Sequence, residues 1–71
     1  TYDVILANIN RNILLQDIPT YSLCLHKDGL LFVSGFYLED MPMIVGMATS
    51  VGLNYVSHDT VDNWCCIKFS K

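Results

Sequence analysis

The 71-residue sequence is 52% hydrophobic and only 15% charged, with a formal net charge of -3. Self-contained domains average about 25% charged residues, and a chain of this length buries only about 60% of its unfolded surface. Either the chain oligomerises through its apolar surface or it is a piece of a larger protein, and we favour the second interpretation. The four basic residues are scattered, which argues against a phosphate-binding stripe for nucleic acid.

The first half of the sequence predicts two strands separated by a helix. Residues 3–9 are an apolar run without polar alternation, as in a strand that is covered on both faces. Residues 12–26 are predicted to be a helix with Pro19 inside it, so we expect a kink or two short helices. Residues 26–29 predict a turn, and residues 30–34 a second buried strand. The apolar face of the helix consists of Leu14, Ile18, Tyr21 and Leu25.

The second half predicts another helix followed by a hairpin. Gly35 closes the second strand at a point where the backbone must bend or let another group approach. The acidic pair at 39–40 and Pro42 mark the start of the helix, and Gly52 lies just beyond its end. Residues 53–58 and 64–69 predict two antiparallel strands joined by a loop at 59–63. The inward stripe of the helix consists of Met41, Ile44, Val45, Ala48 and Val51.

This order of elements predicts an α/β fold. Strands that alternate with helices indicate a parallel sheet sandwiched by helices, and the terminal hairpin adds one reversed strand. We expect residues 1–71 to form a single partial domain. The sequence begins Thr1-Tyr2-Asp3 without an initiator methionine or an apolar signal core, which favours a product of truncation without an exported leader.

Cysteines and histidines suggest no chemistry of their own. The three cysteines have no spacing typical of a disulfide framework or a zinc site, so we expect a reducing compartment and a cytoplasmic protein. Cys65 and Cys66 are neighbours in a predicted strand and should point to opposite faces. Trp64 is interpreted as a core anchor after the turn. The uncharged stretch 41–58 is broken by proline and glycines, which makes it a poor membrane span.

The arrangement and several short motifs resemble the second half of the sheet of a Rossmann-like class I S-adenosylmethionine-dependent methyltransferase. Residues 2–9, Tyr-Asp-Val-Ile-Leu-Ala-Asn-Ile, are similar to the fourth-strand segment of the PrmA family, which methylates the eleventh protein of the large ribosomal subunit. Residues 26–29 stand in the place of that family's Lys-Pro-Gly-Gly turn, and residues 30–35 match its strand ending in Ser-Gly. Trp64 likewise stands near the start of the last strand.

The resemblance implies a role for three residues. Asn8 lies at the carboxyl end of the first strand, where open α/β sheets bind their ligands. Its amide oxygen is expected to accept a hydrogen bond from a target amine and to position that amine for methyl transfer. Ile9 and Gly35 are expected to contact the substrate. Related enzymes have Asn-Pro-Pro-aromatic at this place, whereas this sequence has Asn-Ile-Asn-Arg, which is compatible with the protein-lysine branch.

The resemblance also implies a cofactor and partners. S-adenosylmethionine would be bound only by the full-length enzyme, because none of the four glycines here forms a glycine-rich turn. The expected activity is methylation of lysine or N-terminal amines of a ribosomal protein, with the isolated segment inactive and self-associating through strand 3–9 or its apolar surface. The alternatives are a class I methyltransferase acting on small molecules or other amines, and a non-enzymatic module that binds a partner protein.

Overall fold

The computed structural model describes all 71 residues as one four-stranded sheet with two α-helices. The elements follow the predicted order, with a short 3-10 helix before the second α-helix. Pro19 lies inside a single helix, so two separate helices are not formed. The elements are β1 (Tyr2–Asn8), α1 (Arg11–Cys24), β2 (Leu25–Tyr37), η1 (Leu38–Asp40), α2 (Met41–Ser50), β3 (Asn54–Val61) and β4 (Trp64–Ser70).

The sheet has the strand order β1-β2-β4-β3. β1 and β2 are parallel, and β4 runs antiparallel to both of its neighbours, β2 and β3. Three strands therefore point the same way and β4 alone is reversed, which confirms the prediction of one reversed strand. The carboxyl ends of β1 and β2 meet at the edge of the sheet where the β3–β4 hairpin turns.

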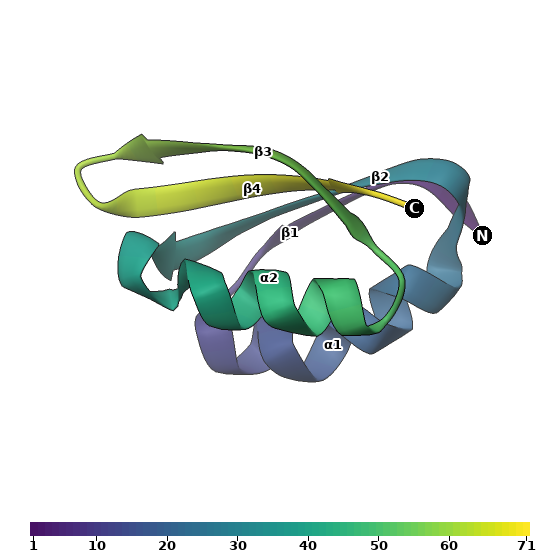
Figure 1. Cartoon of the computed structure of the whole chain (residues 1–71), viewed down its shortest axis with the longest axis horizontal. Coiled ribbons are helices and arrows are strands. Elements are labelled where there is room, and N and C mark those ends of the chain that lie inside the picture. Colours follow the sequence, from purple (N-terminus) through teal and green to yellow (C-terminus); the bar gives the residue numbers. More distant parts are fainter.

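Both helices cover the same face of the sheet, so the predicted helical sandwich is wrong for these residues (Figure 1). The direction of the chain across the sheet explains this. From β1 to β2 to β3 the parallel strands advance in one direction, and crossovers between parallel strands are right-handed. Two right-handed crossovers in one direction leave both helices on one side. The opposite face, which we call the helix-free face, has no helix over it.

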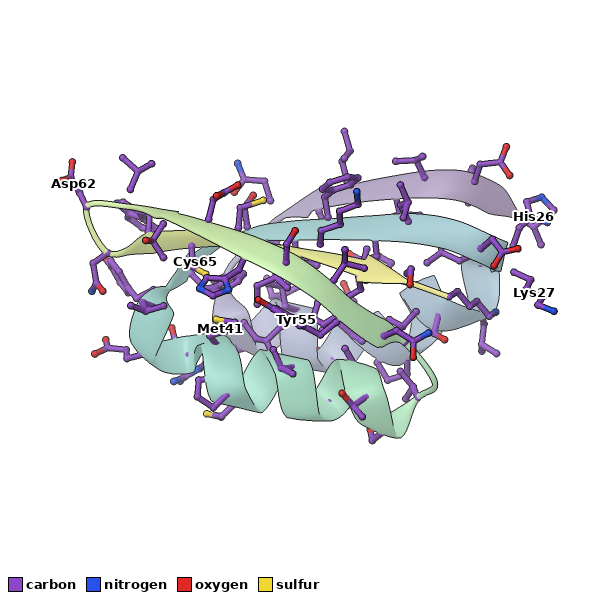
Figure 2. All side chains as sticks on the ribbon, turned by 45° about the horizontal axis from the view of Figure 1, so that its top comes forward. His26, Lys27, Met41, Tyr55, Asp62 and Cys65 are labelled. Atoms are coloured by element: carbon purple, nitrogen blue, oxygen red, sulfur yellow. The ribbon has the colours of Figure 1, made fainter.

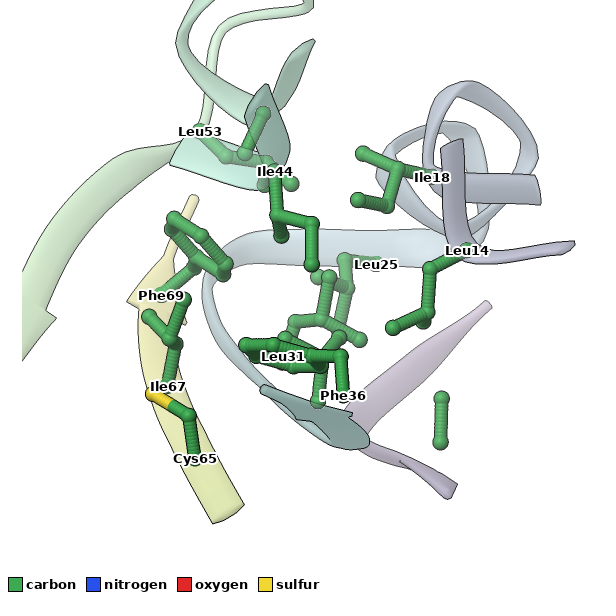
Figure 3. Close-up of a cluster of buried hydrophobic side chains, with 13 residues drawn as sticks. Leu14, Ile18, Leu25, Leu31, Phe36, Ile44, Leu53, Cys65, Ile67 and Phe69 are labelled. Carbon is green, nitrogen blue, oxygen red and sulfur yellow. The ribbon is translucent and has the colours of Figure 1, made fainter. Parts of the chain in front are cut away.

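The hydrophobic core lies between the sheet and the two helices (Figure 3). Alternate residues of β2 and β4 point into it, and the predicted stripe of α2 contributes Ile44 and Ala48. On α1, Ser22 is buried beside Leu14 and Ile18, and its hydroxyl donates to the Val51 carbonyl at 3.0 Å. The core side chains are Ala7, Leu14, Ile18, Leu25, Leu31, Val33, Phe36, Ile44, Ala48, Leu53, Cys65, Ile67 and Phe69.

Three local features position the strands. Gly52 has φ 89° one residue after Val51, the C-cap of α2, and the Leu53 amide donates to the Ala48 carbonyl at 3.0 Å, so glycine lies just beyond the end of the helix as predicted. The hairpin is tighter than the predicted loop 59–63, because β3 extends to Val61 and only Asp62 and Asn63 turn, both with positive φ. The predicted turn 26–29 is an irregularity within β2 that shifts its pairing with β1.

Candidate functional site

An open hollow of about 520 Å³ lies where β1 and β2 end beside the β3–β4 hairpin. The position agrees with the rule that open α/β sheets bind ligands beyond the carboxyl ends of their strands. The hollow brings together all three residues singled out from the sequence, Asn8, Ile9 and Gly35. Its lining residues are Asn8, Ile9, Asn10, Ser34, Gly35, Asp59, Val61, Trp64, Cys65 and Cys66.

Gly35 holds β2 close to the end of β1. It has φ 94°, and a Cβ atom at this position would lie 2.8 Å from both Asn8 Oδ1 and the Ile9 carbonyl oxygen. The Ile9 amide donates to the Ser34 carbonyl at 3.1 Å, which fixes the end of β1 against β2. Any side chain here would combine a left-handed backbone with two close contacts. Glycine therefore permits the arrangement of Asn8 and Ile9.

Trp64 forms part of the wall of the hollow, a position that the sequence interpretation missed. The rings of Tyr37 and Trp64 stack with their centroids 4.4 Å apart and an interplanar angle of 28°. Trp64 lines the hollow and is 49% exposed, so its interpretation as a core anchor is wrong. The two residues are register partners on β2 and β4, and this pairing is not visible in the sequence spacing. The one signal in the sequence that could have indicated an exposed Trp64 was its position at the start of a strand, directly after a turn.

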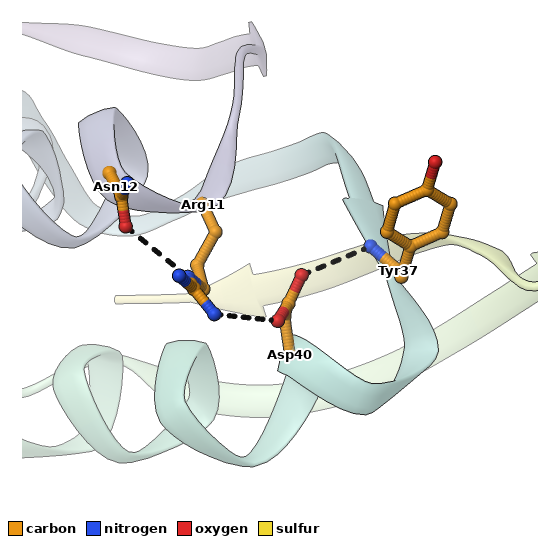
Figure 4. Close-up of polar contacts among 4 residues, drawn as sticks. All are labelled: Arg11, Asn12, Tyr37 and Asp40. Carbon is orange, nitrogen blue, oxygen red and sulfur yellow. Dashed lines mark hydrogen bonds and ion pairs between the residues drawn. The ribbon is translucent and has the colours of Figure 1, made fainter.

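An ion pair fixes the start of α1 beside the start of α2 (Figure 4). Arg11 Nη1 lies 3.1 Å from Asp40 Oδ1. The other carboxylate oxygen of Asp40 accepts a hydrogen bond from the Tyr37 amide at 3.4 Å, and Arg11 Nε donates to Asn12 Oδ1 at 3.3 Å. The acidic pair at 39–40 therefore stands at a helix start, as predicted, and Asp40 also holds the backbone of the residue that stacks on Trp64.

The cysteines and histidines have separate surroundings. Cys65 (labelled in Figure 2) is buried in the core on the helix side of the sheet. Cys66 is exposed, which confirms that the two side chains point to opposite faces. Burial, followed by the neighbouring Cys66 and Asp59, raises the pKa of the Cys65 thiol above its ordinary value of 9.0. His58 Nδ1 lies 2.6 Å from the Tyr55 hydroxyl. No three His, Cys, Asp or Glu side chains gather as they would around a metal ion.

The residues present do not fit the binding of S-adenosylmethionine by themselves. Nucleotide-binding α/β folds hold their cofactor over a glycine-rich turn between a strand and a helix. The connection from β1 to α1 is Ile9-Asn10, and β2 leads directly into η1 and α2. Neither connection is such a turn. The hollow does carry two hydrogen-bond acceptors, the Asn8 amide oxygen and the Ile9 carbonyl oxygen.

Comparisons with known proteins show the family of this chain. The family model for ribosomal protein L11 methyltransferase (PrmA) matches residues 1–71. The ribosomal protein L11 methyltransferase of Phocaeicola vulgatus is 50% identical over 68 residues, which cover 96% of this chain and 24% of that protein. The enzyme of the same name from Bacteroides thetaiotaomicron is 45% identical over 69 residues, 97% of this chain and 25% of that protein.

The fold comparison gives the same result. A crystal structure of ribosomal protein L11 methylase from Lactobacillus delbrueckii subsp. bulgaricus superimposes with a TM-score of 0.91 at 28% identity, and the match covers 97% of this chain and 36% of that chain. This neighbour confirms the predicted α/β fold class of a methyltransferase sheet. The chain spans about a quarter of the length of the curated relatives it matches. By sequence and by fold, the chain belongs to the PrmA family of ribosomal protein L11 methyltransferases.

Proposed function

We propose that these 71 residues are the acceptor-binding part of the catalytic domain of an S-adenosylmethionine-dependent protein methyltransferase. The complete enzyme would methylate lysine side chains and the N-terminal amine of ribosomal protein L11 in the cytoplasm. The observation that carries this proposal is the position of Asn8. In a chain of the PrmA family, this residue lies at the carboxyl end of β1, against Gly35 and inside the hollow.

Asn8 would orient the acceptor amine. A neutral amine has N–H donors and one lone pair, and methylation requires the lone pair to face the incoming methyl carbon. The Asn8 amide oxygen can accept one N–H of the amine, and the Ile9 carbonyl beside it can accept a second. When both N–H groups of the amine are held in this way, its lone pair can point in only one direction. The Trp64 ring, which lines the hollow and is stacked on Tyr37, offers an apolar surface for the methylene groups of a lysine side chain.

The remaining parts of the proposal concern groups beyond these residues. S-adenosylmethionine supplies the methyl group when it is bound, and we propose that it is bound only in the complete enzyme, so that the isolated segment is inactive. We also propose that the isolated segment self-associates. Neither α-helix has the length and apolar character needed to cross a membrane, and nucleic acid and membrane are not among the partners that we propose.

The test is methyl transfer to purified ribosomal protein L11 by the complete enzyme that contains this segment. Asn8→Ala removes the amide oxygen that orients the amine, and we expect kcat/KM to fall about 100-fold, the loss that follows from misplacing a reacting group by about 1 Å. The measurement is the initial rate of labelled methyl incorporation from S-adenosylmethionine.

Asn54→Ala is the matched control, because Asn54 is also exposed but pairs with Ser70 at the other end of the sheet. It should retain the unsubstituted rate. Full activity of Asn8→Ala would contradict the role of this side chain. Transfer to small amines without transfer to L11 would favour the alternative of a small-molecule methyltransferase.

A further inference from the structure

The register of the sheet places four side chains in one row across the helix-free face. Asn8 of β1 pairs with Ser34 of β2, Ser34 pairs with Cys66 of β4, and Cys66 pairs with Asp59 of β3. Direct partners in a sheet point to the same side. All four residues also line the hollow. The row therefore runs along the hollow from Asn8 at one edge strand to Asp59 at the other.

Asp59 is the only charged residue that lines the hollow. It is exposed on β3, and the chain's one ion pair is between Arg11 and Asp40, away from it. Its neighbours in the row, Cys66 and Ser34, carry no formal charge. The end of the hollow opposite Asn8 therefore carries a negative charge without a cationic partner in the chain, and an acceptor with a positive group at this position would be attracted there.

The width of the sheet separates the Asp59 carboxylate from a target amine at Asn8. Asn8 and Asp59 are three strands apart, and neighbouring strands lie about 4.8 Å apart, so their backbones are separated by about 14 Å. One amine cannot contact both side chains. An extended peptide covers about 14 Å with about four residues. A cation that contacts Asp59 would therefore belong to a different residue of the same acceptor.

We propose that Asp59 is a specificity-determining residue that binds a second cationic group of the acceptor while the target amine lies at Asn8. The preferred acceptor would carry a Lys or Arg side chain about 14 Å from the amine that is methylated. This proposal rests on the proposed function, because it presupposes an amine acceptor in the hollow.

The test compares steady-state kinetics of the complete enzyme with purified ribosomal protein L11 at about 0.05 M and about 0.5 M salt. Asp59→Asn removes the charge and keeps the shape. At low salt we expect KM for L11 to rise about two- to five-fold, the size of effect that exposed ion pairs produce, with kcat within about two-fold. At high salt the difference should shrink, since screening weakens exposed charge pairs. Asp59→Glu, which keeps the charge, should restore most of the affinity.

Asp28→Asn is the matched control. It removes the same charge beside Lys27, at the end of the molecule opposite the hairpin tip (Figure 2), and its positive φ of 68° suits asparagine. An unchanged KM in Asp59→Asn, or an equal rise in Asp28→Asn, would overturn the inference. If the unsubstituted enzyme transfers no methyl group to L11, the proposed function fails first, and the inference fails with it.

Discussion

Gly35 leaves no room for a Cβ atom beside Asn8, and its substitution by alanine should affect both stability and activity. Alanine would be held at φ 94° with its Cβ 2.8 Å from Asn8 Oδ1. A left-handed backbone costs a residue with a Cβ about 1–2 kcal/mol, and relief of the contact would displace Asn8. We expect Gly35→Ala to lower the free energy of unfolding of the complete enzyme by at least that amount, measured by denaturant titration, and to reduce kcat.

Gly46→Ala is the control for this prediction. Gly46 lies in α2, and a Cβ there would have no neighbour within 4 Å. Alanine in a helix interior is about 0.5–1 kcal/mol more favourable than glycine, so this variant should gain stability and keep its activity. If the two variants lost stability equally, the strain at Gly35 would not be the cause.

The site could be predicted from the sequence only where the relevant residues are close in the chain or carry a family motif. The family resemblance singled out Asn8, Ile9 and Gly35, which lie at the ends of apolar runs, and the structure brings all three to one hollow. Asp59 and Trp64 were not found. They reach the hollow through the pairing of β4 with β2 and β3, and single-sequence periodicity does not give the register between strands.

At the scale of the elements, the start of α1 depends on one side-chain hydrogen bond. Asn10 Oδ1 accepts from the Ile13 amide at 3.0 Å, which satisfies one of the free donors of the first turn. Asn10→Ala should lower the free energy of unfolding by about 1 kcal/mol, the usual loss for removal of such a cap. The measurement is again denaturant unfolding of the complete enzyme.

Asn12→Ala controls for the loss of an exposed asparagine from the same turn. The structure gives its side chain a single partner, the Arg11 Nε atom, and no backbone amide. The expected change is within about 0.5 kcal/mol, as for other surface substitutions. A loss as large as that of Asn10→Ala would contradict the capping role that the structure gives to Asn10.

The elements were predicted well where local chemistry decides them and less well where packing does. The turn at Gly52 and the stripe of α2 follow from local rules and are confirmed. Pro19 did not divide α1, because Ile18 before the proline and Ser22 after it are both buried against the rest of the molecule. β2 runs from Leu25 to Tyr37 because β1 and β4 pair with it on both sides, and its predicted length, 30–34, reflected only the apolar centre.

For the whole molecule, the sequence indicated an excess of apolar surface, and the topology shows where that surface lies. Both helices cover one face (Figure 1). The apolar residues that alternate with the core residues of β1 and β2 therefore point to the helix-free face. Leu6 is 77% exposed there and Val4 is 50% exposed. This explains why the sequences of β1 and β2 lack polar alternation, as in strands that are covered on both faces. In this structure the two helices cover one of those faces (Figure 1).

The last prediction concerns the self-association of the isolated 71-residue chain. β1 is an edge strand with one neighbour, and it carries Leu6 on the helix-free face. Unpaired apolar edges recruit other chains, and lysine on an edge strand prevents it. We expect the chain to associate at micromolar concentration and Leu6→Lys to weaken this at least about tenfold, since burying a leucine contributes about 1.5–3 kcal/mol. Sedimentation velocity measures the effect.

Leu23→Lys is the control for this prediction, because Leu23 is 80% exposed on α1 and not on β1. This variant should associate like the unsubstituted chain. A monomeric unsubstituted chain, or equal weakening by both substitutions, would show that the β1 surface is not the interface.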